Sequence, residues 1–345
     1  MISSLNRITD KIRHLFPGLV LLTIITVYLL ILAGGIVRGT GSGMGCPDWP
    51  QCFGRWVPPT EVSQLPPNYQ QIYGAKLKGE VEFNAVKTWI EYINRLLGAF
   101  AGLLVFALLI SSLSFLRRNT AVFIGSLTAF VLIGANAWLG SRVVATELAD
   151  YLITLHLLLA VLVVFALLFV YIRTGKLNDF TVGNVQRNAG LNWLLVVTMF
   201  VSLGQVILGT QVRDVLDGIV KMLGYAQRDN WIGAMDWHFY VHRSFSLVIL
   251  GLHLWVIYQL RRASSTGILN SLVGSLAGVV IAEIATGAVM AYFSVPAIAQ
   301  PIHLFLAVVM LGLQFAAFLL LNQKRGNATN ELDGFLVSAK IALPE

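Results

Sequence analysis

Eight long apolar segments, separated by shorter polar ones, follow one another along this chain. An apolar helix of about 20 residues is long enough to cross the hydrocarbon core of a bilayer. The pattern therefore predicts an all-α polytopic membrane protein with eight transmembrane helices. The first segment is too long for a cleavable signal peptide and lacks a small-residue cleavage site, so we expect no such peptide. The predicted spans are residues 18–38, 88–115, 120–141, 150–172, 191–211, 237–260, 268–291 and 300–321.

Composition agrees with this pattern, because 57% of the 345 residues are hydrophobic and only 12% are charged. Such a chain is too apolar for a soluble domain. The net charge of +7 does not indicate nucleic-acid binding, since half of the basic residues gather at the ends of the spans on one side. The positive-inside rule makes that side cytoplasmic and places both termini there. These basic residues are Arg7, Lys11, Arg13, Arg117, Arg118, Arg173, Lys176, Arg187, Arg261, Arg262, Lys324 and Arg325.

The second half of the sequence resembles the first half. His156 and His303 stand in similar apolar contexts 147 residues apart, while Asn94 and His242, each followed by arginine, stand 148 residues apart. Both halves begin on the same side of the membrane, so we predict two parallel repeats, each a four-helix bundle. The predicted parts are an N-terminal bundle over 1–180 with a long external loop over 40–87, a C-terminal bundle over 185–325, and a polar tail over 326–345.

Three of the even-numbered spans contain a histidine near their start, and the fourth contains Asn94 at the matching place. Even-numbered spans would run inward from the external face, so the four residues share a level near that face. Alternate helices of an antiparallel bundle face each other across its core. His242 would therefore face His303, and Asn94 would face His156. Histidine is costly at membrane depth, and paired axial ligation of haem iron explains these positions best.

Other residues could contribute to these sites. His238 lies one turn before His242 on the same face and is an alternative ligand, whereas His253 is interpreted as a packing or hydrogen-bonding residue. Arginine suits bidentate binding of carboxylates such as the haem propionates, and the alternative for each arginine is an interfacial anchor. The arginines considered for this role are Arg95, Arg243, Arg38, Arg142 and Arg213.

One acidic position distinguishes the two halves. Glu91 lies one turn before Asn94 on the same helix face, and the corresponding residue of the second half is Phe239. This difference predicts a reactive first half and an electron-transfer second half. Glu91 could stabilise positive charge on a substrate carbon or pass a proton. The alternative is a carboxylate favoured simply by the start of its helix.

Polar residues also stand four positions before three glycines in the odd-numbered spans. At this spacing the polar side chain and the glycine share a helix face. Close packing with a polar group that joins two helices is the interpretation for the first two pairs. An ionisable residue at this depth is a functional candidate, which singles out Glu283. The pairs are Asn136 with Gly140, Gln205 with Gly209, and Glu283 with Gly287.

The chain has two cysteines, Cys46 and Cys52, and both belong to the first external loop. This loop is rich in glycine, proline and aromatic residues, and loops of such length in compact proteins are usually functional. The external side of a membrane is oxidising, which favours a disulfide with a structural or redox role. Metal binding is the alternative, although no histidine lies nearby in the sequence.

With these motifs the chain resembles the haem A synthase family in its bacterial and mitochondrial branches, over about residues 18–325. The resemblance implies an oxidoreductase that oxidises the C8 methyl group of haem O to a formyl group through a hydroxylated intermediate. It implies haem b as a cofactor in the second half and haem O as the substrate in the first. The matching features are the loop from Cys46-Pro47-Asp48-Trp49-Pro50 to Cys52 and Gly54, the Glu91-to-Arg95 motif, His156, His242-Arg243 and His303.

The resemblance also implies roles for individual residues. His242 and His303 would bind the haem b iron, His156 would belong to the substrate site with Asn94 and Arg95, and Glu91 would be the essential carboxylate. The cysteine pair corresponds to a disulfide that in some members is linked to reduction or haem handling. The implied partners are haem O, the haem O synthase, a quinol or thiol electron donor, membrane lipid and a second copy of the chain, in a bacterial cytoplasmic (inner) membrane and without nucleic acid.

Asn94 departs from the family pattern, which usually has histidine at this place. Because an amide oxygen is a poor ligand for haem iron, we expect the substrate haem to be held by His156 alone or to bind water next to Asn94. A different partner for His156 is the alternative. Many members also have a second cysteine pair in the third external loop, which this chain lacks. Two other functions remain open: a di-haem electron-transfer cytochrome, and a non-catalytic haem-binding or transfer protein.

Overall fold

The computed structural model describes residues 2–74, 82–175, 189–263 and 267–323. Within these residues the fold is helical, and eight helices are long and apolar enough to cross a membrane. The predicted fold class is confirmed, and the chain is that of an integral membrane protein. The eight helices are α1 (Ile2–Gly39), α3 (Ala85–Ser112), α4 (Thr120–Ala145), α5 (Asp150–Arg173), α6 (Ala189–Leu223), α7 (Trp237–Ala263), α8 (Gly267–Tyr292) and α9 (Ala299–Asn322).

Helix α6 is longer than the apolar pattern predicts. The predicted fifth span ends at residue 211, but the helix continues to Leu223. The apolar pattern stops at Arg213 and Asp214, yet charged residues are compatible with a helix when their charges are paired. Arg213 pairs with Asp217 one turn later at 2.7 Å, and Arg38 of α1 pairs with Asp214. The end of α6 therefore remains helical, and α1 likewise begins earlier than predicted.

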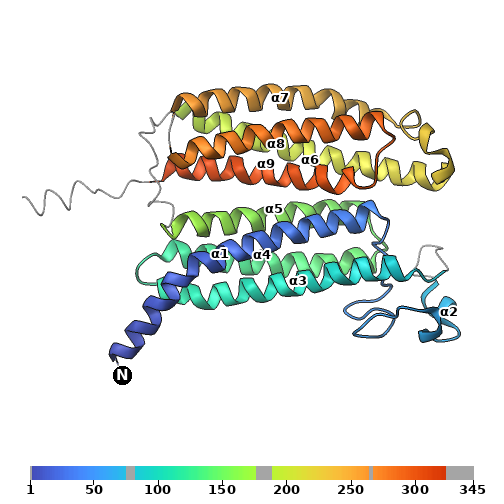
Figure 1. The fold of residues 1–345 in the computed structure, drawn as a ribbon, viewed down its shortest axis with the longest axis horizontal. Helices are drawn as coiled ribbons and strands as arrows, with labels where there is room; N and C mark the ends of the chain where they lie inside the picture. The colour runs from blue at the N-terminus through green and yellow to red at the C-terminus, as the bar shows by residue number, and fades with distance from the viewer. Residues whose placement is uncertain (1, 75–81, 176–188, 264–266, 324–345) are drawn as a thin grey trace, which may run out of the picture.

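The helices lie in two groups of four, one above the other in Figure 1. The first group comprises α1, α3, α4 and α5, and the second comprises α6 to α9. Helices α3 and α5 each contact α1 and α4, while α7 and α9 each contact α6 and α8. The helices that carry Asn94 and His156, and those that carry His242 and His303, are therefore diagonal neighbours. Helix α9 also packs against α1 and α5 and joins the two groups.

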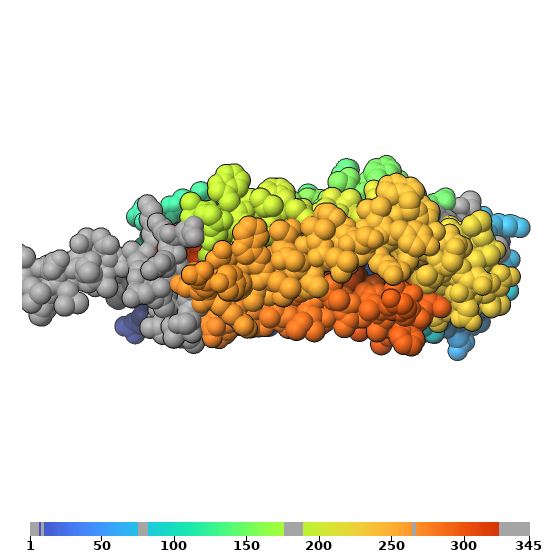
Figure 2. All heavy atoms as spheres, turned by 90° about the horizontal axis from the view of Figure 1, so that it is seen from above, coloured from blue at the N-terminus to red at the C-terminus, as the bar shows by residue number. Residues whose placement is uncertain are grey.

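Two long connections that contain short helices of their own lie at the same end of the molecule, which we call the loop end. They are the first loop, which contains α2 (Tyr69–Tyr73), and the connection between α6 and α7, which contains η5 (Tyr225–Asn230). Both lie at the right in Figure 1, and Figure 2 shows the yellow α6–α7 connection covering this end of the second group. Helices α3, α5, α7 and α9 all begin at the loop end, so their first turns share one level.

Helix α9 lies at the centre of the molecule. Of its most apolar stretch, 56% is buried inside the protein, compared with 17% for α8. Aromatic contacts join it to the first group: Phe305 meets the edge of Tyr28 of α1, and Phe315 stacks on Phe165 of α5 at 4.4 Å between ring centroids. A histidine on α9 is therefore carried by the helix that has the least freedom to move relative to either group.

Two matching turns precede α5 and α9. Glu147 and Leu148 have φ angles of 54° and 66°, and Ser294 and Val295 have φ angles of 51° and 53°. Non-glycine residues rarely adopt this left-handed conformation, and the two pairs are 147 residues apart. The shared geometry supports the predicted internal repeat, which stays a prediction. The predicted boundary between the halves, near 180–185, and the tail over 326–345 lie outside the described residues.

Candidate functional site

Three histidines near the loop end pack against glycines of the helix that precedes them in the chain. In each pair the Cε1 atom of the imidazole ring occupies the space that a side chain on the glycine would need. The glycine therefore sets how closely the ring approaches the neighbouring helix. The pairs are Gly140 with His156, Gly209 with His242, and Gly287 with His303, where a Cβ added to the glycine would stand 3.1, 3.2 and 3.4 Å from Cε1.

Asn94 occupies the fourth equivalent position. Its Oδ1 atom lies 3.9 Å from the place where a Cβ on Gly34 would stand. The same atom is buried and has no hydrogen-bond partner among the described residues. The structure thus presents one arrangement four times, with an imidazole on glycine in three cases and a carboxamide on glycine in the fourth.

His242 and His303 face each other across the second helix group. Their ring centroids are 6.4 Å apart and their planes make an angle of 77°. Two imidazoles that share one metal ion have ligating nitrogens about 4 Å apart, twice a bond of about 2 Å, and their centroids lie further apart than these nitrogens. The observed separation fits one ion between the rings. In the described part of the chain, Nε2 of neither ring has a hydrogen-bond partner, so the residues present fit a haem held on two histidines.

The neighbouring histidines have other partners. Nδ1 of His238 lies 2.7 Å from a carboxylate oxygen of Asp236, and its ring stacks on Trp237. His253 is fully buried, donates from Nδ1 to the carbonyl oxygen of Ile249 at 2.8 Å, and is hydrogen-bonded through Nε2 to the amide of Gln314 on α9. Both rings are thus engaged within the protein. This favours His242, one turn after His238, as the α7 residue that pairs with His303 of α9.

Glu91 lies in the second turn of α3 and is buried, with 4% of its surface exposed. Its Oε2 atom accepts a hydrogen bond from the backbone N–H of Cys46 at 2.9 Å. Its Oε1 atom accepts a hydrogen bond from Nε of Arg95 at 3.1 Å and forms an ion pair with the same guanidinium. A buried carboxylate is tolerated when it is paired and hydrogen-bonded. Glu91 therefore connects α3 to the first loop, a contact that the sequence did not predict.

Arg95 also holds the first loop. Its guanidinium donates to the carbonyl oxygens of Cys46 at 3.1 Å, Asp48 at 2.6 Å and Gln51 at 3.0 Å. Cys46 and Cys52 form a disulfide with a Cα–Cα distance of 4.8 Å, so the predicted disulfide is confirmed and the metal alternative is wrong. Arg95, proposed from the sequence as a substrate-haem residue, thus contacts three carbonyls of the segment that the disulfide closes.

A charged network joins the two helix groups at the loop end. Arg38 at the end of α1 pairs with Asp214 and, at 3.3 Å, with Asp217 of α6. Arg213 pairs with Asp217, donates to the carbonyl oxygen of Arg38 at 3.1 Å, and hydrogen-bonds Gln300 of α9. Sequence reasoning missed both aspartates, although the spacing of Arg213 and Asp217 is that of a helical ion pair. A haem propionate at Arg38 or Arg213 would have to compete with these aspartates.

Arg243 has different surroundings. Its side chain is exposed, and its guanidinium carbon lies 6.0 Å from the ring centroid of Tyr292. No carboxylate pairs with it in the described part of the chain. Of the arginine candidates next to a proposed ligand, Arg243 is therefore the one whose charge is free to meet an acidic group of a bound molecule.

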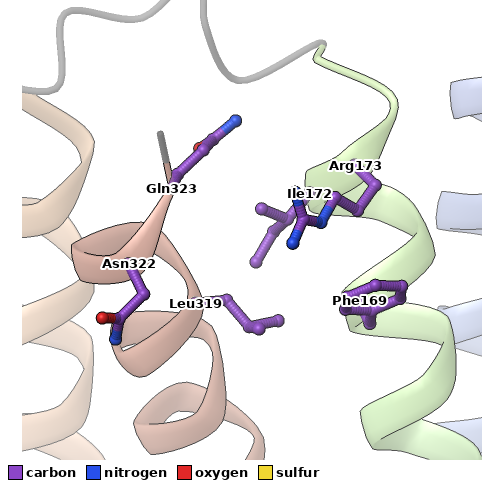
Figure 3. Close-up of a pocket in the computed structure, with 6 residues that line it drawn as sticks. All are labelled: Phe169, Ile172, Arg173, Leu319, Asn322 and Gln323. Carbon is purple, nitrogen blue, oxygen red and sulfur yellow. The ribbon is translucent and has the colours of Figure 1, made fainter. Parts of the chain in front are cut away.

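A small pocket of about 40 Å³ lies between α5 and α9 at the opposite end of the molecule. Figure 3 shows Arg173 reaching from α5 toward α9 across this pocket. At about 1.5 Å per residue, Phe169 lies about 20 Å along α5 from His156, so the pocket is separate from the histidines, and it is too small for a haem. Its lining consists of Phe169, Ile172, Arg173, Leu319, Asn322 and Gln323.

Fold and site together define an integral membrane protein with two four-helix groups, in which His156, His242 and His303 lie near the loop end and a disulfide-closed loop covers the first group. The family model of the COX15-CtaA cytochrome oxidase assembly proteins matches residues 18–315. This match covers most of the chain, and the chain belongs to that family.

Curated relatives of this chain bear the name heme A synthase. The chain is 30% identical to the protein of Shewanella oneidensis over 194 residues, 54% of each chain. It is 31% identical to that of Bartonella bacilliformis over 151 residues, 40% of this chain and 42% of the relative. With the protein of Rickettsia bellii the identity is 24% over 321 residues, 83% of this chain and 92% of the relative. The chain thus spans about half the length of the first two relatives and most of the third.

Proposed function

We propose that the protein is a haem A synthase, an oxidoreductase that converts the C8 methyl group of haem O to a formyl group through a hydroxylated intermediate. Membership of the cytochrome oxidase assembly family and the name shared by the relatives support this proposal. The observation that carries it is a difference between two otherwise matching sites. One has two facing histidines, and the other has one histidine, Asn94 and a buried carboxylate. A reaction that needs both an electron carrier and a substrate site requires such a difference.

In the second helix group, His242 and His303 would hold haem b as the resident cofactor. When bound, haem b supplies a centre that accepts and donates single electrons. The residues of this chain keep the two rings facing each other, because each ring packs on a glycine of the preceding helix. Arg243 follows His242 directly and offers its unpaired guanidinium to a propionate.

In the first helix group, His156 would hold haem O as the substrate, with Asn94 on the diagonal helix. A carboxamide is a weak ligand for iron, so we propose that the substrate has a single protein ligand. Glu91 is the proposed catalytic carboxylate, which stabilises positive charge on the reacting carbon or takes its proton. The buried position of Glu91 one turn from Asn94, with Arg95 as its partner, supports this assignment.

We further infer that the protein resides in a bacterial cytoplasmic membrane with both termini in the cytoplasm and with the haem sites near the external face. The basic residues at the span ends support this orientation, and the disulfide at the loop end fits an oxidising side. Oxidation of a methyl group to a formyl group removes four electrons, so the proposed reaction requires haem O, supplied by the haem O synthase, and an oxidant such as dioxygen, with a quinol or thiol as the electron donor for each of the two hydroxylations. A second copy of the chain and surrounding lipid complete the expected partners.

Expression of the protein with a source of haem O, followed by pigment extraction and chromatography, tests the activity. Glu91→Gln should lower haem A formation by about 10²- to 10⁴-fold, the contribution expected of a positioned acid or base, and should leave the haem b absorption unchanged. Glu61→Gln, at an exposed carboxylate of the first loop, is the matched control. Full activity of Glu91→Gln would remove this residue from the mechanism. Absence of both haem A and the hydroxylated intermediate with the unaltered protein would favour a cytochrome or a haem transfer protein.

A further inference from the structure

A polar residue stands one helical turn before each glycine on which a histidine packs. The three residues lie on α4, α6 and α8, the helices that receive the imidazole rings. At the fourth position, where Asn94 replaces histidine, the residue one turn before Gly34 is Leu30. The polar residue thus accompanies the histidine and is missing where the histidine is missing. The three residues are Asn136, Gln205 and Glu283.

These polar side chains contain buried atoms without partners. Among the described residues, the side-chain oxygens Asn136 Oδ1, Gln205 Oε1 and Glu283 Oε2 are all buried and lack hydrogen bonds. Nδ1 of His156 and of His242 is likewise buried without a well-formed hydrogen bond, although the backbone carbonyls of Asn136 and Gln205 lie near them. Unsatisfied buried polar atoms are costly and rare. At both sites an imidazole Nδ1 and a side-chain oxygen thus lie buried together, and neither has a well-formed hydrogen bond.

The neighbours of the third histidine favour a proton on Nδ1 of its ring. Nδ1 of His303 lies 3.0 Å from Oγ1 of Thr286 and 3.3 Å from Oε1 of Glu283. The Thr286 hydroxyl also lies within 2.9 and 3.0 Å of the carbonyl oxygens of Ala282 and Glu283, so its own proton goes to the backbone. The hydroxyl oxygen is then placed to accept from Nδ1, which favours a proton on Nδ1 that is shared between Thr286 and the carboxylate of Glu283. Nε2 is thereby left free to bind a metal.

We propose that Asn136, Gln205 and Glu283 are positioning residues, each of which orients the Nδ1–H of one ligand histidine. Of the two haem b ligands, His303 then donates more electron density to the iron than His242, because the carboxylate of Glu283 lies beside its Nδ1. This inference rests on the proposed function of the second helix group. A ligand histidine that donates its other N–H to a carboxylate is held in one orientation and becomes more basic. Gln205, fixed by its own bond to the carbonyl of His242 at 2.8 Å, offers His242 only an amide. The more basic His303 therefore stabilises the oxidised form of haem b relative to the reduced form.

A redox titration of the purified full-length protein with its haem, at one fixed pH, tests this inference. Glu283→Gln gives both ligands an amide partner, and we expect the redox equilibrium to shift about tenfold toward the reduced form, which is ~59 mV for one electron. The low-spin absorption of a haem held on two histidines should persist. Gln205→Glu should shift the equilibrium in the opposite direction. Asn136→Asp, the matched change in the other helix group, should leave the haem b potential where it was.

Three results would overturn the inference. The first is an unchanged potential in Glu283→Gln with its haem retained. The second is a shift in Asn136→Asp as large as the shift in Gln205→Glu, which would show that any added carboxylate has this effect. The third is an unchanged potential in Gln205→Glu. If Glu283→Gln loses its haem, the result with Gln205→Glu decides the test. The titration does not depend on turnover: an unaltered protein without haem would contradict the proposed function itself, whereas bound haem with an unmoved potential would contradict only the role of Glu283.

Discussion

The loop ends of the two helix groups share a frame but differ in what covers it. The first group is covered by hydrogen-bonded and charged groups, with Glu91 and Arg95 bound to the disulfide loop. The second group has an apolar cover, in which Phe239, at the position of Glu91, is buried together with Trp231 and Met235. Phe239 thus offers no group that exchanges protons at the position where the first group has Glu91. One backbone arrangement thus presents two different environments through a small number of side chains.

The largest expected effect is on the pair of histidines that distinguishes the second group. His303→Ala should abolish haem b binding, because the iron loses one of its two proposed ligands and only His242 remains. The low-spin haem absorption of the purified protein measures this loss. His238→Ala is the control, since that ring is engaged with Asp236 and should not be needed. Retention of the low-spin signal in His303→Ala would break the distinction between the groups.

Asn94→His should make the first group resemble the second. The new imidazole would pack on Gly34 as the other three pack on their glycines, and His156 would gain a facing ring. We expect a low-spin signal from haem in the first group, measured by electron paramagnetic resonance with haem O supplied. If the unaltered protein already shows two such signals, and these persist in His238→Ala and His253→Ala, the single-ligand substrate site is wrong.

Arg95→Gln tests the polar cover of the first group. Loss of the guanidinium removes its bonds to Glu91 and to three loop carbonyls. A displacement of about 1 Å at a reacting group costs about 100-fold in rate, so haem A formation should fall about 100-fold while haem b remains bound. Arg55→Gln, at an exposed arginine of the same loop, is the control. Unaltered turnover in Arg95→Gln would show that the loop does not position Glu91.

The smallest expected effect concerns a polar contact outside both sites. Gln314→Leu should lower the free energy of unfolding by about 1–3 kcal/mol, because Nε2 of buried His253 loses its partner. The midpoint of thermal unfolding in detergent measures this change. The double variant His253→Leu with Gln314→Leu should recover most of the loss, since no buried polar atom is then unpaired. A double variant as unstable as the sum of both changes would assign the contact a different role.

The sequence alone predicted the helical fold, the eight spans, the facing pair His242 and His303, and the disulfide. These features depend on local properties: the length of apolar segments, the spacing of histidines along helices, and a cysteine pair within one loop. The helix ends were less predictable, because α6 continues through charges whose partners lie on another helix. The assignment of haem to the histidines rests on the same local spacing and on the proposed function.

Only the tertiary structure decided how the polar groups are paired. The sequence could not show that Glu91 and Arg95 bind the disulfide loop, that Asp214 and Asp217 neutralise Arg38, or that Thr286 and Glu283 stand behind His303. Hydropathy and periodicity state which residues share a face of one helix. The partner of a buried polar group depends on which faces meet after the helices pack, and that is a property of the folded protein.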